Sequence, residues 1–194
     1  MEVIYGLNSI KALIHHKEGG VEKIIIASGR GGASVKEIVE IARKNKIPFE
    51  FGQRKYLDEL AGTPDHQGIV GFCKSFTYTD LDVLIKNRNP SFNSDLILVL
   101  DSVMDPQNLG SIIRTAHCLG ANGVVIPVDR AAPVTAAVHK ASAGSVQHIP
   151  VSRVVNLSQT LDYLKDQGFW IFGAEAHTGN NLQDMDFKCP VVLV

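Results

Sequence analysis

The sequence predicts an α/β protein, with a small N-terminal α/β unit followed by a domain built on a mostly parallel sheet. Short runs of consecutive apolar residues, typical of strands covered on both faces, recur along the 194 residues. Segments with apolar residues at helical spacing lie between these runs. Because strands that alternate with helices form parallel sheets with helices on both sides, this order indicates the fold class.

The first 75 residues are expected to form the small unit, which is within the usual size range of a domain. Apolar residues at helical spacing and short apolar runs alternate along it, and Ser34 is a candidate N-cap. In chain order, the expected elements are a helix at 5–14, a strand at 21–27, a helix from 34, a strand at 48–51, a helix at 54–60 and a strand at 68–72.

Residues 76–95 are polar and rich in turn signals, so we expect a linker with at most one helical turn at 81–85. The second domain is expected to occupy residues 96–194. Its expected strands are 96–100, 123–127, 149–151, 169–174 and 190–194, and its expected helices begin near 108, 135 and 157.

The segment 96–119 joins a buried strand to a helix through the turn residues 101–107, and Asn108 is a plausible N-cap for that helix. Five apolar residues at helical spacing are expected to face the core: Leu109, Ile112, Ile113, Ala116 and Leu119. Arg114 interrupts this pattern, with Gly110 and Cys118 one turn away. Small neighbours leave room for a ligand around the guanidinium, although a solvated surface arginine would show the same pattern.

The segment 108–116, Asn-Leu-Gly-Ser-Ile-Ile-Arg-Thr-Ala, resembles the first motif of the SpoU-type RNA ribose 2′-O-methyltransferases of the SPOUT superfamily, Asn-x-x-Gly-x-x-Arg-Ser/Thr-Ala, at every fixed position. The preceding Leu-Asp-x-x-x-Asp-Pro-Gln also resembles that family. Tyr5-Gly6-Leu7-Asn8 and the segment 66–71, His-Gln-Gly-Ile-Val-Gly, resemble its N-terminal substrate-binding domain. Both segments are similar to the RlmB-type branch, which modifies large-subunit ribosomal RNA.

The resemblance implies that S-adenosylmethionine donates a methyl group to a ribose 2′-hydroxyl of RNA, in a guanosine of large-subunit (23S) ribosomal RNA. Transfer RNA modifiers share the 108–116 pattern and remain an alternative. Arg114 and Asn108 are the implied catalytic residues. A guanidinium stays protonated in proteins, so Arg114 is better suited to hold a phosphate and stabilise an alkoxide than to act as a base. Asn108 would orient Arg114 or the ribose. A dinucleotide-binding enzyme is disfavoured because no Gly-x-Gly-x-x-Gly follows a strand.

Further site residues also follow from the resemblance. Residues 173–176, Gly-Ala-Glu-Ala, occupy the place of a family turn beside the cofactor pocket, which makes Ala174, Glu175 and Ala176 cofactor-binding candidates. A strand-to-loop transition would explain these small residues equally well. Candidate RNA-binding residues are Arg30, His66 and Gln67. A mobile surface turn around Arg30, and capping of the next strand by His66 and Gln67, remain open.

In the family, a strand like residues 191–194 leads into a Gly-x-Glu-Gly motif and later a Ser-Leu-Asn-Val segment, which build a trefoil knot and most of the cofactor pocket. Neither segment is in this sequence. We therefore expect the methyltransferase domain to be incomplete at its C-terminal end and the chain to bind the cofactor poorly or not at all. If the protein does end at Val194, a non-catalytic RNA-binding module is the alternative.

Composition adds weaker constraints. Residues 1–75 carry 11 basic and 9 acidic residues and residues 76–194 carry 8 and 11, giving net charges of +2 and −3 and the overall −1. Because RNA binders usually show a basic face, the first segment is the better place for RNA contacts. The three cysteines show no metal-ligand or disulfide spacing, so no metal is expected. With no signal peptide or membrane span evident, a cytoplasmic location is expected. The resemblance implies a homodimer.

Overall fold

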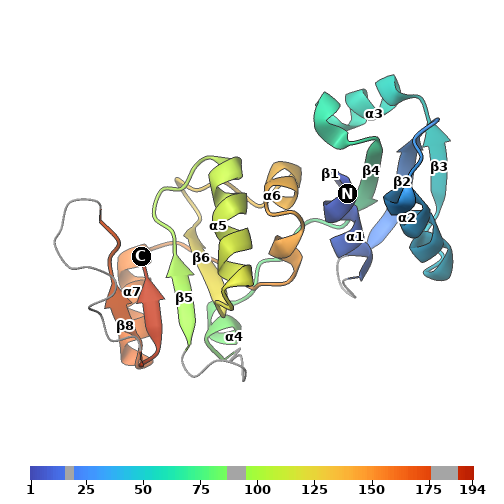
Figure 1. Ribbon diagram of the computed structural model, residues 1–194. Helices are drawn as coiled ribbons and strands as arrows, with labels where there is room; N and C mark the ends of the chain where they lie inside the picture. The colour runs from blue at the N-terminus through green and yellow to red at the C-terminus, as the bar shows by residue number, and fades with distance from the viewer. Residues whose placement is uncertain (16–19, 87–94, 176–187) are drawn as a thin grey trace. The chain divides into compact units, whose positions relative to one another are not determined.

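The computed structural model describes residues 1–15, 20–86, 95–175 and 188–194 (Figure 1). The chain divides into two compact units. Unit 1 comprises Met1–Thr77 and Pro133–His148, and unit 2 comprises Tyr78–Ala132 and Ile149–Val194. The expected domain limits of 1–75 and 96–194 stay a prediction, and the order of the sequence does not indicate that Pro133–His148 packs in unit 1.

Unit 1 contains a four-stranded sheet in the order β1-β4-β2-β3. Strand β4 is antiparallel to both of its neighbours, whereas β2 and β3 are parallel. The elements of unit 1 are β1 Glu2–Tyr5, α1 Leu7–His15, β2 Val21–Ala27, α2 Ala33–Lys44, β3 Phe49–Gly52, α3 Arg54–Ala61, a 3-10 turn Pro64–His66, β4 Ile69–Cys73, α6 Ala136–Ala141 and a 3-10 turn Ser145–Gln147.

The sheet of unit 1 is covered on both faces. Ile24 and Ile26 of β2 pack with the buried sides of α1 and α2. Ile25 and Ala27 belong to a second cluster with Leu57 of α3. Successive side chains of a strand point to opposite faces, so β2 must be apolar along most of its length. The strand predicted at 21–27 is confirmed at its expected limits.

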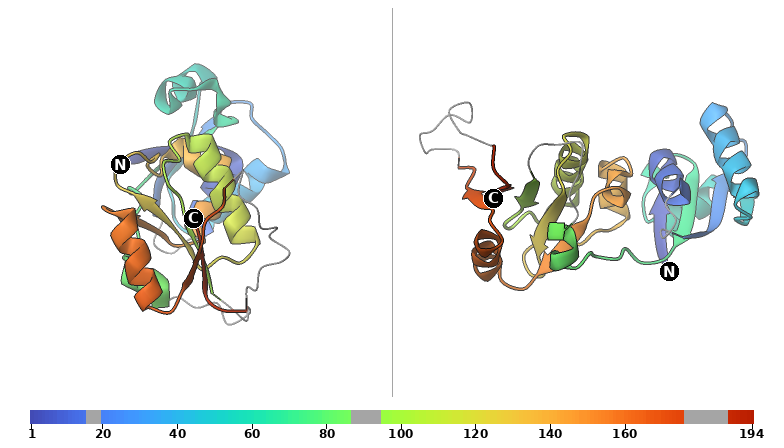
Figure 2. Two further views of the ribbon diagram at one scale, coloured as in Figure 1. Left: turned by 90° about the vertical axis from the view of Figure 1, so that its left-hand side faces the viewer. Right: turned by 90° about the horizontal axis from the view of Figure 1, so that it is seen from below.

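Unit 2 contains a parallel five-stranded sheet in the order β7-β6-β5-β9-β8. Helices α4 and α7 pack on one face, and α5 lies on the other (Figure 2). This arrangement confirms the predicted α/β class with a parallel sheet in the second part of the chain. The elements of unit 2 are α4 Leu81–Lys86, β5 Leu96–Val99, α5 Pro106–Cys118, β6 Gly123–Pro127, β7 Val151–Val154, α7 Leu157–Asp166, β8 Trp170–Phe172 and β9 Val191–Leu193.

The prediction that Asn108 caps α5 is wrong. The N-cap is Asp105, whose carboxylate accepts a hydrogen bond of 3.1 Å from the backbone N–H of Gln107. Proline fits the first helical position because it has no N–H to leave unpaired, so Pro106 starts the helix two residues before Asn108. Leu119, expected in the core, lies beyond the helix end and is 68% exposed.

Two expectations for unit 1 are also wrong. Residues Glu2–Tyr5 form a strand, which pairs with β4, so the first helix begins at Leu7 rather than at Tyr5. Helix α2 begins at Ala33, and Ser34 therefore lies inside it rather than capping it. The residue before α2 is Gly32, whose φ of +112° favours glycine over residues with a Cβ.

His139 of α6 makes the stability of unit 1 depend on pH. Its side chain is buried and packs edge-on against Phe76, and burial lowers its pKa to about 4. In the unfolded chain this histidine has an ordinary pKa near 6.5, so between that pH and pH 4 it is protonated in the unfolded state but neutral in the folded state. We expect the unfolding free energy to fall by about 3 kcal/mol between pH 6.5 and pH 4 from this group.

Urea unfolding at several pH values measures this dependence. The variant His139→Leu has no proton to bind at this position, so its stability should fall less steeply over the same range. An equal slope for the variant and the unsubstituted protein would contradict the assignment.

Candidate functional site

Arg114 and Asn108 lie on the exposed surface of α5. Long side chains on a helix incline toward its N-terminus, which directs the side chain of Arg114 over the preceding turn, at residues 110 and 111. Within the described part of the chain, neither side chain takes part in a hydrogen bond or an ion pair. The expected hydrogen bond from Asn108 that would orient Arg114 is therefore not formed in this structure, and both polar groups are available to a ligand.

The hydroxyl groups beside Arg114 are used within the helix. Ser111 donates to the carbonyl of Asn108 and Thr115 donates to the carbonyl of Ser111, each at 2.9 Å. Gly110, one turn before Arg114, is buried and leaves no side chain beside the guanidinium. This face of α5 thus presents a fixed cation with five N–H donors, a group suited to phosphate or a developing alkoxide.

The cofactor candidates lie where β8 ends. The N–H of Ala174 donates to the carbonyl of Val194 at 2.8 Å, which extends the pairing of β8 with β9. This geometry agrees with the strand-to-loop interpretation. Ala174 and Glu175 are exposed, and a Cβ added at Gly173 would meet no atom within 4 Å. The residues thus offer one open edge to a ligand. Ala176 lies outside the described residues.

The structure brings the three RNA-binding candidates together at the end of the unit 1 sheet where β2 finishes and β4 begins, which we call the unit 1 edge. Arg30 lies in the turn after β2, and its side chain crosses Gly68, where an added Cβ would lie 3.1 Å from the Cδ atom of Arg30. His66 and Gln67 precede Gly68 at the start of β4. Arg30 and Gln67 are exposed, but His66 is completely buried.

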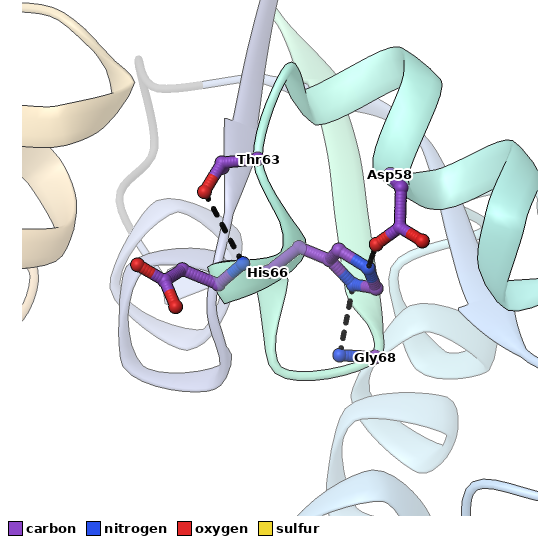
Figure 3. A network of polar contacts seen from close by, with 5 residues as sticks. Asp58, Thr63, His66 and Gly68 are labelled. Atoms are coloured by element: carbon purple, nitrogen blue, oxygen red, sulfur yellow. Dashed lines mark hydrogen bonds and ion pairs between the residues drawn. The ribbon is translucent and has the colours of Figure 1, made fainter.

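His66 holds the turn before β4 in place (Figure 3). Its Nδ1 accepts a hydrogen bond of 3.0 Å from the N–H of Gly68, and its Nε2 lies 2.8 Å from a carboxylate oxygen of Asp58. Because Nδ1 is the acceptor, the ring proton is on Nε2, and this N–H donates a hydrogen bond to the carboxylate of Asp58. Burial and these two contacts favour the capping interpretation for His66. The RNA-binding role of Arg30 and Gln67 stays a prediction.

Lys140 joins this edge from a distant part of the sequence. Its ammonium group lies 5.7 Å from the centre of the Tyr5 ring and 3.4 Å from a carboxylate oxygen of Asp65. A Cβ on Gly6 would lie within 4 Å of both Lys140 and Gln67, whose Oε1 accepts a hydrogen bond of 3.0 Å from the N–H of Leu7 at the start of α1. No local sequence pattern indicates this placement of Lys140, because the residues that it meets lie 75 or more positions earlier in the chain.

The described residues contain no group of three or more histidine, cysteine, aspartate or glutamate side chains that could hold a metal ion. Among the helices they form, none has the length and apolar character needed to cross a membrane.

Family models match both parts of the chain. Residues 95–194 match the SpoU rRNA Methylase family, and residues 3–79 match the model described as RNA 2′-O ribose methyltransferase substrate binding. The first match contains α5 with Asn108 and Arg114, and the second contains Arg30, His66 and Gln67.

Curated relatives are similar over most of their length. The putative TrmH family tRNA/rRNA methyltransferase YacO of Bacillus subtilis is 39% identical over 172 residues, which are 89% of this chain and 69% of the relative. A putative TrmH family tRNA/rRNA methyltransferase of Staphylococcus saprophyticus is 37% identical over 192 residues, covering 99% of this chain and 76% of the relative.

Solved structures share the fold. The SpoU methyltransferase AviRb from Streptomyces viridochromogenes, solved in complex with AdoMet, has a TM-score of 0.76 at 22% identity and covers 98% of this chain and 70% of its own. An rRNA methyltransferase from Sinorhizobium meliloti has a TM-score of 0.74 at 21% identity, with 99% and 69% covered.

Proposed function

This chain belongs to the SpoU rRNA Methylase family, and from that premise we propose that it methylates the ribose 2′-hydroxyl of a guanosine in large-subunit ribosomal RNA. The observation that carries the proposal is the unpaired and exposed guanidinium of Arg114, six residues after the exposed Asn108 on α5. A ribose 2′-hydroxyl requires RNA rather than DNA as the substrate.

S-adenosylmethionine supplies an electrophilic methyl group to this reaction. The chain must hold the 2′-hydroxyl oxygen in line with that group and stabilise the negative charge that develops as the hydroxyl loses its proton. We assign that stabilisation to Arg114, which stays protonated and binds the adjacent phosphate through a planar pair of donors. The amide of Asn108 is assigned to the ribose, since it does not bind Arg114 in this structure.

The cofactor edge is assigned to Ala174 and Glu175. Their exposure and the open space beside Gly173 fit one side of such a ligand. No step of the reaction is assigned to these residues.

The substrate RNA is assigned to the edge of unit 1 that carries Arg30, Gln67 and Lys140. Two of these side chains are cations, which fits a phosphate backbone. The variant Arg30→Gln should weaken RNA binding for every sequence tested and should reduce the slope of log affinity against log salt by about one unit. Affinities at several salt concentrations measure this slope. An unchanged slope would exclude a phosphate contact by Arg30, and Lys36→Gln on α2 is the matched control.

Mapping of ribose methylation tests the activity and its substrate. Ribosomal and transfer RNA from cells that lack the gene are incubated with the whole gene product and S-adenosylmethionine, and the 2′-O-methylated positions are located. A new methyl group on a guanosine of 23S RNA is the expected result. Methylation of transfer RNA would move the substrate to that class, while bound RNA that gains no methyl group would favour a non-catalytic RNA-binding module.

The homodimer implied for the family also belongs to this proposal. Two apolar side chains that flank α5 are exposed to solvent: Met104 just before the helix and Leu119 just after it. Sedimentation that shows only monomer at micromolar concentration would count against a dimer.

A further inference from the structure

A pocket of about 380 Å³ opens at the carboxyl ends of β5, β6 and β7 in unit 2. We call this cavity the strand-end pocket. Its lining residues are Asp101, Pro127, Asp129, Arg130, Val155, Asn156, Leu157 and Ser158.

The walls of the strand-end pocket are tied together by hydrogen bonds. Arg153 of β7 donates to the carbonyl of Val128 at 2.9 Å while its guanidinium packs over the ring of Tyr78. The N–H of Ala132 donates to the carbonyl of Val103, which joins the loop after β6 to the loop after β5. These bonds join the loops that carry the lining residues.

The lining divides into an apolar floor and a charged rim. Pro127 is buried and Leu157 is half-buried, whereas Asp101, Asp129 and Arg130 are exposed. Within the described part of the chain, Asp129 and Arg130 form no ion pair, either with each other or with another residue. One oxygen of Asp101 accepts a hydrogen bond of 3.0 Å from the hydroxyl of Ser102, which leaves the other oxygen for a ligand. The rim thus offers carboxylate acceptors and guanidinium donors around an apolar floor.

This combination matches one nucleobase. Guanine presents two adjacent donors, N1–H and the N2 amino group, and two adjacent acceptors, O6 and N7. A carboxylate accepts from such a donor pair, and arginine binds O6 and N7 with two parallel hydrogen bonds. Adenine, cytosine and uracil lack two neighbouring ring-edge donors, so carboxylates on the rim select against them.

We propose that the strand-end pocket binds a guanine base of the RNA substrate, with Asp101 and Asp129 accepting from N1–H and N2 and Arg130 donating to O6 and N7. The inference rests on the proposed function, because it supplies the base preference of an enzyme that acts on a guanosine.

Titration of the protein with guanosine, inosine and adenosine 5′-monophosphates, followed by amide NMR, tests the pocket directly. The three ligands share the ribose and phosphate, so differences among them report the base alone. GMP should perturb the amides of residues 101, 128–130 and 155–158 and bind about fivefold more tightly than IMP, which lacks the N2 amino group. AMP should bind more weakly than IMP. Equal binding of the three nucleotides, no binding at millimolar concentration, or perturbations elsewhere would overturn the proposal.

A double variant, Asp101→Asn with Asp129→Asn, should lose the preference for GMP over IMP. The matched control is Asp162→Asn with Asp166→Asn, which removes two exposed carboxylates of α7 outside the pocket and should keep the preference. The comparison of nucleotides on the unsubstituted protein does not depend on either variant folding. Selective binding of guanine with no RNA methylation would contradict the proposed function but not this inference. RNA methylation with no guanine selectivity would contradict this inference but not the proposed function.

Discussion

Replacing Arg114 with lysine should lower the rate of RNA methylation about 100-fold, the usual cost of removing one oriented donor from a site of developing charge. Lysine keeps the positive charge but replaces a planar fork of donors with a mobile point charge. The affinity for RNA should change little, because long-range attraction to phosphates needs only the charge. Initial rates of methyl transfer and RNA affinities, measured on the same preparations, separate these two effects.

The matched control for this variant is Arg43→Lys. Arg43 lies on α2 in unit 1, where its guanidinium packs over the ring of Phe49. Because it belongs to neither the α5 face nor the RNA edge, its replacement should leave methylation unchanged. Methylation by Arg114→Lys within twofold of the unsubstituted protein would remove Arg114 from the mechanism.

Replacing Gly144 with alanine should lower the free energy of unfolding by about 3 kcal/mol. Gly144 has a φ of +87°, and a Cβ at this position would lie 2.5 Å from the Cβ of Ala12 and 3.0 Å from the carbonyl oxygen of Asn8. Both of these atoms belong to α1, and the carbonyl oxygen is a backbone atom that no change of side-chain rotamer can move. The variant must therefore separate the segment Pro133–His148 from α1 or distort both.

Urea unfolding of this variant is compared with that of Gly31→Ala. Gly31 meets no atom within 4 Å of an added Cβ and is not among the glycines with positive φ, so alanine there should change stability by less than about 1 kcal/mol. A Gly144→Ala protein as stable as the control would show that this junction tolerates a side chain. RNA affinity should also fall in Gly144→Ala, since Lys140 reaches the unit 1 edge through the same segment.

The fold class was predictable because it depends on local patterns. The apolar runs of β2 and β6 end where turn residues follow, and both strands have the limits expected from sequence. The period of α2 likewise places Val35, Ile38 and Ala42 in the core. The start of α5 was misplaced because Asp105 and Asn108 are both acceptable caps by residue type. The proline between them, which begins the helix, decided in favour of Asp105.

The candidate site was predictable only in part. Asn108 and Arg114 are six residues apart within one predicted helix, so their nearness along it follows from sequence, whereas the exposure of both side chains is found in the structure. The role of His66 is not local, because its ring is held between Asp58 and the N–H of Gly68. Lys140 is separated from Tyr5 by 135 positions, and no periodicity connects them.

The sequence by itself determined most of the strand and helix segments, although not strand β1 or the start of α5, and it placed the cation Arg114 within that helix. Hydrophobic periodicity and turn-forming residues act within a few positions, so the secondary structure of each segment can be predicted from that segment alone. Only the tertiary structure decided that Lys140 stands beside Tyr5, that His66 is buried and that three loops enclose the strand-end pocket. Those outcomes depend on which surfaces exclude water together, a property of the packed chain that no single segment carries.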